Sequence, residues 1–179
     1  IKFILSMEHG VWGIDDNRAK MIGRNNVEPI QGAKIIDLYD TINVGQCIIY
    51  MNSKNKIVEI YDKLMNDNFP VEYITGDRSV KERNDIMEKF RSGSLRILLS
   101  SDLLSRGIDI QQLSLVINYD LPREKETYIH RIGRSGRYGR KGVAINLIND
   151  REIEYMKHIE EFYDTKINEM PKNIIDYLN

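Results

Sequence analysis

The order of short apolar runs and longer amphipathic segments constrains the fold of this chain more than any other feature. Short runs bounded by polar residues or glycine are typical of buried strands, whereas apolar residues that recur with the helical period are typical of helices. These patterns predict strands at residues 47–51, 71–74, 96–100, 114–119 and 143–148. Because helical segments separate them, the strands are expected to form parallel β-α-β units of an open α/β sheet with helices on both faces.

Capping residues predict where several of the helices begin and end. Asn52 or Ser53 is expected to cap the helix that follows the first strand. Ser79 and Glu82 form an S-x-x-E capping box that opens the next helix, and Gly93 ends it. The first of these helices has one apolar face, made of Ile57, Ile60, Tyr61 and Leu64. Further helices are predicted at 34–40, 124–132, 152–162 and 174–178, whereas no element is predicted in residues 1–33, where glycines interrupt any period.

Composition limits the kinds of partner that the chain can bind. With 179 residues, 41% of them apolar and 30% charged, it has the balance of a soluble globular protein of one domain, or two at most. Lys and Arg number 26 and Asp and Glu number 27, so the net charge is −1 and any binding to nucleic acid must come from a local patch. No apolar run reaches the length of a membrane helix, and no membrane partner is predicted.

The few cysteines and histidines argue against several classes of metal site. Cys47 is the only cysteine, which excludes a disulfide framework, a cysteine-based zinc site and an iron–sulfur cluster, and favours a reducing intracellular compartment. His9 and His158 have no partners at metal-ligand spacing, so no metal ligand is predicted in this chain. The chain begins with Ile1, and we expect it to be a fragment of a longer protein.

A basic, glycine-rich segment follows the predicted helix 124–132. Residues 131–141 contain five basic side chains, three glycines and no acid. Arg131, Arg134 and Arg137 recur at every third position, so their planar guanidinium groups can project together toward a polyphosphate, which the glycines allow the backbone to approach. The alternative interpretation is a solvated basic loop.

Two further segments follow predicted strands. In Ser100–Asp109, the hydroxyls at the end of the strand can contact a phosphate and Asp109 can accept a hydrogen bond from a ribose, although a serine cap and a glycine turn would explain the same residues. In Gly76–Arg83, a turn followed by a capped helix is a sufficient explanation. Neither segment identifies a function when it is considered alone.

Together these segments resemble the motifs of one enzyme family. SSDLLSRGID at 100–109, followed after 20 residues by HRIGRSGR at 130–137, resembles motifs V and VI of the DEAD-box RNA helicases. CIIYMNSK at 47–54 looks like motif IV of that family, and YITGDRSVKER at 73–83 looks like the segment before motif V. Residues 109–146 resemble the initiation factor 4A branch, including its exon-junction relative, and the whole resemblance covers about residues 34–179.

The resemblance implies a RecA-like fold and the second of the two domains of a helicase. It implies a helicase C-terminal domain at 34–179, preceded by a divergent segment at 1–33. ATP would lie in the cleft between this domain and the N-terminal RecA-like domain. Asp109 matches the residue that contacts the ribose of ATP, and Gly107 matches the motif V glycine near the nucleotide. Arg134 and Arg137 match the catalytic arginines that reach the γ-phosphate.

The remaining matched positions concern the closed cleft and the RNA. His130 and Arg131 match positions that hold the cleft closed. The positions that match contacts to the RNA sugar-phosphate backbone are Ser53, Gly76, Arg78 and Ser101.

The sequence departs from the family pattern at several of these places. Thr75 stands where the family usually has His, and Val80 stands where it usually has Gln. Arg78 stands where the family usually has Met, so a side-chain contact from Arg78 to RNA is inferred from its charge alone. Ser100 and Ser101 replace a pair of threonines and keep the hydroxyl groups.

The sequence contains neither a G-x-x-x-x-G-K-[ST] phosphate-binding loop nor a DEAD tetrapeptide. The lysine that cradles the phosphates of ATP and the acids that bind Mg²⁺ are therefore expected on the N-terminal domain, and the fragment alone is predicted to be inactive.

We expect the full-length protein to be an ATP-dependent RNA helicase of the initiation factor 4A type that acts in translation initiation. RNA, the N-terminal domain and a HEAT-repeat scaffold protein are the expected partners, and the cytoplasm, with the nucleus as an alternative, is the expected location.

Alternatives to this function stay open. An exon-junction or mRNA-processing member of the same branch would carry the same motifs, and the domain alone could be a non-catalytic module that binds a scaffold protein. A related DNA helicase is disfavoured by the resemblance of residues 109–146 to the 4A branch.

Overall fold

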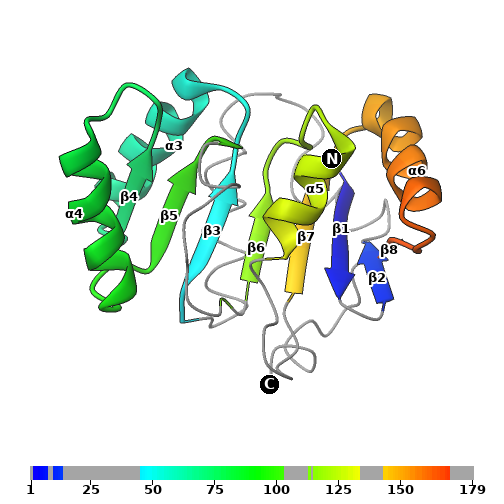
Figure 1. Cartoon of the computed structure of the whole chain (residues 1–179), viewed down its shortest axis with the longest axis horizontal. Helices are drawn as coiled ribbons and strands as arrows, with labels where there is room; N and C mark the ends of the chain where they lie inside the picture. The colour runs from blue at the N-terminus through cyan, green and yellow to red at the C-terminus, as the bar shows by residue number, and fades with distance from the viewer. Residues whose placement is uncertain are drawn as a thin grey trace.

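The computed structural model describes residues 2–7, 10–13, 45–102, 113, 115–133 and 143–169. Its helices are α3 (Lys54–Asn66), α4 (Val80–Arg91), α5 (Lys125–Ile132) and α6 (Ile153–Phe162), with a short 3-10 helix, η2 (Asp150–Glu152), before α6. Its strands are β1 (Lys2–Met7), β2 (Gly10–Gly13), β3 (Cys47–Tyr50), β4 (Val71–Ile74), β5 (Ile97–Ser100), β6 (Leu115–Asn118), β7 (Val143–Ile148) and β8 (Asn168–Glu169). Within the described residues these strands form one sheet (Figure 1).

The centre of the sheet is parallel, as the sequence predicts. The strands are ordered β2-β1-β7-β6-β3-β5-β4, and every neighbouring pair from β7 to β4 is parallel. The five strands predicted from the apolar runs are β3 to β7, and their positions are confirmed to within a residue at either end. After β3 the chain goes first to β4 at the edge of the sheet, returns to β5 beside β3, and then crosses to β6 and β7 on the other side of β3.

Four of the five parallel strands, β3 to β6, end level with one another, and β7 runs two residues further. Tyr50, the last residue of β3, pairs with Ser100 on one side and with Asn118 on the other. Ile74 also pairs with Ser100, and Asn118 pairs with Asn146. The segments that follow the strands therefore leave the sheet along a single edge, which is where open α/β sheets place their ligands. We call it the carboxyl edge.

Helices cover both faces of the sheet, as predicted. The buried face of α3, made of Ile57, Ile60 and Leu64, packs on one side against alternate strand residues such as Ile49 and Leu99. The buried residues of α4 pack on the opposite side, against Ile48, Leu98 and Val116 among others. Ile132 of α5 packs against both this second cluster and the cluster beneath α6, so α4 and α5 share a face (Figure 1).

The predicted helix caps are present. Ser53 is the extended N-cap residue of α3, although its side chain makes no capping bond. Ser79 and Glu82 form a complete capping box at the start of α4. Ser92 caps the other end of α4, and Gly93 follows with φ of +80°, a backbone conformation that suits glycine best. The helices predicted at 124–132 and 152–162 are confirmed as α5 and α6.

The first part of the chain adds strands that the sequence pattern does not predict. All six residues of β1 pair with β7 in antiparallel register, and both β2 and β8 pair with β1. The predicted helices at 34–40 and 174–178 lie outside the described residues, as does the boundary at residue 33, so the division into two segments stays a prediction. Among the helices that the structure describes, none is long and apolar enough to cross a membrane.

Candidate functional site

Three positions predicted to contact RNA lie at the carboxyl edge. Ser53, Gly76 and Ser101 follow β3, β4 and β5, which are neighbours in the sheet and end level. Ser101 is half-buried and its carbonyl accepts a hydrogen bond of 2.7 Å from the hydroxyl of Ser100, whereas Gly76 is exposed. The sheet thus brings together residues that are far apart in the sequence, as the prediction requires.

An ion pair joins two of these turns directly. The ammonium of Lys54, the first residue of α3, lies 2.6 Å from a carboxylate oxygen of Asp77 in the turn after β4. The bond from Lys54 is the largest cause that lowers the pKa of Asp77 to about 2, so Asp77 keeps its charge at any physiological pH. The pair holds the turn at Gly76 beside the start of α3, where Ser53 lies.

The side chain of Arg78 lies against the sheet rather than along the edge. Its guanidinium carbon is 3.9 Å from the centre of the Tyr73 ring, and one nitrogen is 3.6 Å from a carboxylate oxygen of Glu72. The ring of Tyr73 also packs against the ring of Tyr61, with the two rings steeply inclined to each other. The predicted contact from Arg78 to RNA stays a prediction, and it would have to draw the guanidinium away from this stack.

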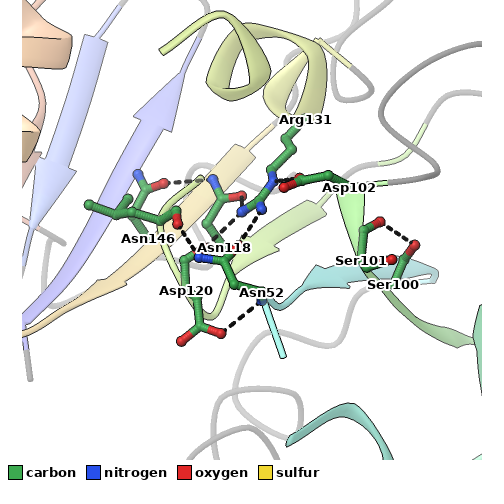
Figure 2. A network of polar contacts seen from close by, with 9 residues as sticks. Asn52, Ser100, Ser101, Asp102, Asn118, Asp120, Arg131 and Asn146 are labelled. Atoms are coloured by element: carbon green, nitrogen blue, oxygen red, sulfur yellow. Dashed lines mark hydrogen bonds and ion pairs between the residues drawn. The ribbon is translucent and has the colours of Figure 1, made fainter. Parts of the chain in front are cut away.

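The guanidinium of Arg131 is fully buried at the carboxyl edge and organises a polar network (Figure 2). Its Nε donates a 2.6 Å hydrogen bond to Asp102, with which it forms an ion pair. Nη1 donates to the backbone carbonyl of Asp120 at 2.7 Å and to Oδ1 of Asn118 at 3.2 Å. Nη2 donates to Oδ1 of Asn52 at 2.9 Å. The residues that follow β3, β5 and β6 are thereby tied to the last turn of α5.

The network continues into the sheet through two buried asparagines. Asn118 of β6 donates a 2.7 Å hydrogen bond to Asn146 of β7, and Asn146 donates a 3.1 Å bond to the hydroxyl of Tyr128 in α5. Both asparagines are fully buried, so these partners are needed to offset the loss of water. Sequence reasoning did not assign a role to either residue, and the available signal was a polar residue inside an apolar strand.

His130 and Arg131 are adjacent but face opposite sides. Arg131 is fully buried, whereas His130 is exposed. In this structure the guanidinium of Arg131 bonds within its own domain, and the predicted part of both residues in holding a cleft closed stays a prediction. Among the residues that the structure describes, no group of three or more His, Cys, Asp or Glu side chains could hold a metal ion.

Gly107, Asp109, Arg134 and Arg137 lie outside the described residues, but the structure describes where their segments begin. Asp102 leads into the segment that contains Gly107 and Asp109. Gly133 ends α5, with its amide donating a 2.8 Å bond to the carbonyl of Ile129, and leads into the segment that contains Arg134 and Arg137. Because Asp102 and Arg131 form an ion pair, both segments start from the same part of the carboxyl edge.

Comparison with known proteins places the whole arrangement in one family. The family model described as the helicase conserved C-terminal domain matches residues 31–139. The chain is 55% identical, over 145 residues that make up 81% of it, to the ATP-dependent RNA helicase eIF4A of Saccharomyces cerevisiae strain YJM789. It covers 37% of that relative, so it spans a little over a third of the length of the relatives it matches.

Solved structures agree with the sequence comparison. The C-terminal domain of the DEAD-box protein Dbp5 is 33% identical, with a TM-score of 0.73, and the match covers 84% of this chain and 88% of that one. Dbp5 of S. cerevisiae, solved with RNA and ADP BeF3, is 34% identical, with a TM-score of 0.73, and the match covers 82% of this chain and 39% of that one. The open parallel sheet described above is therefore the RecA-like fold that the sequence predicted.

Proposed function

Because the chain belongs to the helicase C-terminal domain family, we propose that it forms the C-terminal half of an ATP-dependent RNA helicase of the initiation factor 4A type. The observation that carries the proposal is the ion pair between Asp102 and Arg131. It joins the two segments that match motifs V and VI at one edge of the sheet, as a shared ATP site requires. The intact enzyme would hydrolyse ATP to ADP and phosphate and use the change to clamp RNA and separate its strands locally.

The RNA side of the proposed site consists of Ser53, Gly76, Arg78 and Ser101. The first, second and last of these lie after neighbouring parallel strands, which supports their acting on one stretch of RNA backbone. Hydroxyl groups and backbone amides suit contacts to phosphates and 2′-hydroxyls, which do not depend on base sequence. Dbp5, a protein of the same fold, has been solved bound to RNA and ADP BeF3.

The ATP side consists of Gly107 and Asp109, which would contact the nucleotide and its ribose, and of Arg134 and Arg137, which would contact the γ-phosphate. Guanidinium groups at that place stabilise the charge that develops on the transferred phosphoryl group. The N-terminal RecA-like domain would supply the phosphate-binding lysine and the acids that bind Mg²⁺. His130 would act at the closing surface between the two domains.

The resemblance to initiation factor 4A supports a role in translation initiation in the cytoplasm. A HEAT-repeat scaffold is the proposed protein partner. The solved complexes of Dbp5 with Gle1 show that a domain of this fold can be held by another protein, which supports the proposal without identifying the partner. An exon-junction or mRNA-processing role is the second candidate, because it would use the same motifs.

Substitution of the proposed arginine fingers tests this function. In the intact two-domain protein, Arg134→Ala and Arg137→Ala should each lower kcat by about 10³- to 10⁵-fold, because fingers of this kind have that effect where they have been measured. Lysine should not substitute, since it lacks the planar fork. The melting temperature and the affinity for ATP should change little, because the phosphates are held mainly by the other domain.

Arg151→Ala is the matched control, since Arg151 is an exposed arginine of η2 that matches none of the positions assigned to ATP or RNA. It should leave kcat unchanged. An unaltered kcat in both finger variants, with a normal melting temperature, would show that the segment is a solvated basic loop and would remove the basis of the proposal.

A further inference from the structure

We propose that Asn52 is a positioning residue that couples RNA binding at one part of the carboxyl edge to ATP binding at another. The inference rests on the proposed function, and it assigns a role to a residue that sequence analysis considered only as a helix cap. In the structure the cap of α3 is Ser53, and the Asn52 side chain is engaged elsewhere.

Every polar group of the Asn52 side chain has a partner. Oδ1 accepts the 2.9 Å bond from Nη2 of Arg131 (Figure 2), and Nδ2 donates a 2.7 Å bond to the backbone carbonyl of Leu121. The backbone amide donates a 2.9 Å bond to a carboxylate oxygen of Asp120, whose other oxygen accepts from Lys56. An amide held by both its donor and its acceptor has one orientation, so it transmits a displacement instead of absorbing it.

On one side, Asn52 is joined to the RNA-facing turns. Ser53 is its neighbour in the chain, and Lys54 is paired with Asp77 in the turn that contains Gly76. A phosphate that binds to Ser53 and Gly76 would order both turns at once. The backbone of Asn52 lies in the same short segment between β3 and α3, so it would be ordered with them.

On the other side, Asn52 is joined to the start of both ATP-facing segments. Arg131 lies three positions before Arg134, and its Nε is bonded to Asp102, at the start of the segment that contains Asp109. The orientation of this guanidinium therefore sets where the two segments begin, one just after β5 at Asp102 and the other just after α5 at Gly133. Among the groups that accept hydrogen bonds from Arg131, Asn52 is the one that lies next to Ser53 in the chain.

The exposure of Asn52 separates this role from a purely structural one. Asn118, which also accepts from Arg131, is fully buried, so its loss would leave polar atoms without water. Asn52 is exposed, and water can replace its oxygen when the side chain is removed. We therefore expect Asn52→Ala to fold normally and to lose the transmission between the two parts of the edge.

The experiment measures RNA affinity of the intact two-domain protein with and without a non-hydrolysable ATP analogue. The ratio of the two affinities is the coupling factor, which typically lies between about 5 and 150 in coupled systems and must be the same for ATP affinity with and without RNA. Asn52→Ala should lower this factor roughly ten-fold, or to about 1 where it starts smaller. RNA affinity without nucleotide, ATP affinity without RNA and melting temperature should stay as in the unsubstituted protein.

Two further variants define the cause. Asn52→Asp keeps an oxygen that can accept from Arg131, but it loses the amide that donates to the carbonyl of Leu121 and places a carboxylate oxygen against that carbonyl, so it should also lose most of the coupling. Asn55→Ala, which removes an exposed asparagine three positions further on in α3, should retain all of it.

The outcomes distinguish this inference from the function on which it rests. If the unsubstituted protein shows no RNA binding that ATP strengthens, the proposed function fails, and the inference fails with it. If that protein is coupled but Asn52→Ala is coupled equally well, the inference alone fails. It also fails if Asn52→Asp keeps the full coupling, or if Asn52→Ala lowers the melting temperature and both separate affinities together.

Discussion

Arg131 shows how one buried cation can determine the arrangement of a site. A guanidinium has its donors in a fixed planar fork, and here they reach a carboxylate, a backbone carbonyl and two side-chain amides. Burial of such a charge is costly unless its partners are complete, so the arrangement of those partners is strongly specified. The segments after β3, β5 and β6 have a common reference point in this one side chain.

Removal of that side chain should destabilise the domain. Arg131→Ala leaves polar partners without their donor, and we expect a loss of about 3 kcal/mol in the free energy of unfolding, at the low end for buried pairs because Asp102 is partly exposed. Arg131→Lys should recover little, since a single ammonium cannot reach the same acceptors. Urea unfolding of residues 1–179 measures both values.

Arg151→Ala again serves as the control and should change the free energy of unfolding by about 0.5 kcal/mol or less. A loss of that small size in Arg131→Ala would mean that the network contributes little to stability.

At the residue scale, the sequence predicts side chains that belong to a contiguous motif better than those that act across the sheet. Ser53, Gly76 and Ser101 were expected at the ends of strands, and the structure brings the three to the same edge. Asn118 and Asn146 gave no such expectation, because their partners are known only once β6 and β7 are paired. The direction of the Arg78 side chain could not be predicted either, since it depends on the place of the Tyr73 ring in the folded domain.

At the scale of single elements, the last turn of α5 controls the segment that carries Arg134 and Arg137. The amide of Gly133 bonds to the carbonyl of Ile129, and a Cβ atom on Gly133 would lie 2.9 Å from that carbonyl oxygen. Such a contact is too short for carbon and oxygen, and the obstacle is backbone rather than a flexible side chain. A larger residue at this position must therefore move the end of α5.

Gly133→Ala in the intact protein should lower kcat more than it lowers stability, because the displaced segment carries the proposed fingers. We expect a reduction of roughly 100-fold, the size that a small misplacement of reacting groups can cause. Gly45→Ala is the matched control, since a Cβ there meets nothing within 4 Å. If both alanine variants keep the full kcat, the exit from α5 does not position the fingers.

Elements with a strong local signal were predicted, and elements that depend on a distant partner were not. The capping box of Ser79 and Glu82, the glycine at 93 and the apolar face of α3 are local, and all are confirmed. The apolar runs of β3 to β7 are likewise local. β1 pairs along the whole of β7, which is far from it in the sequence, and its apolar run of three residues, Phe3-Ile4-Leu5, is too short to predict a strand by itself.

The molecule as a whole supplies one side of the proposed active site. Residues 1–179 alone should show no ATP hydrolysis above background, with or without RNA, because the sequence has no phosphate-binding loop. Binding of this chain to single-stranded RNA should be weak and should weaken further as the salt concentration rises. A plot of the logarithm of the affinity against the logarithm of the salt concentration should have a slope of about −0.7 for each phosphate contacted. Titrations at several salt concentrations, with RNAs of different sequence, measure both the slope and any base preference.

Turnover stimulated by RNA in the isolated chain would contradict the half-site interpretation. A marked preference for one base sequence would contradict recognition through the RNA backbone.

The central place of β3 in the sheet also has a consequence for when the domain can fold during its synthesis on a ribosome. β3 is made first among the parallel strands, yet its neighbours are β5 and β6, and β6 begins only at Leu115. At the usual synthesis rates of about 5 to 20 residues per second, the apolar residues of β3 must wait about 3 to 14 s for their last partner. A nascent chain released at residue 112 should therefore expose β3 to protease, whereas the chain of 179 residues should protect it. Equal protection of the two would mean that β3, β4 and β5 fold without β6.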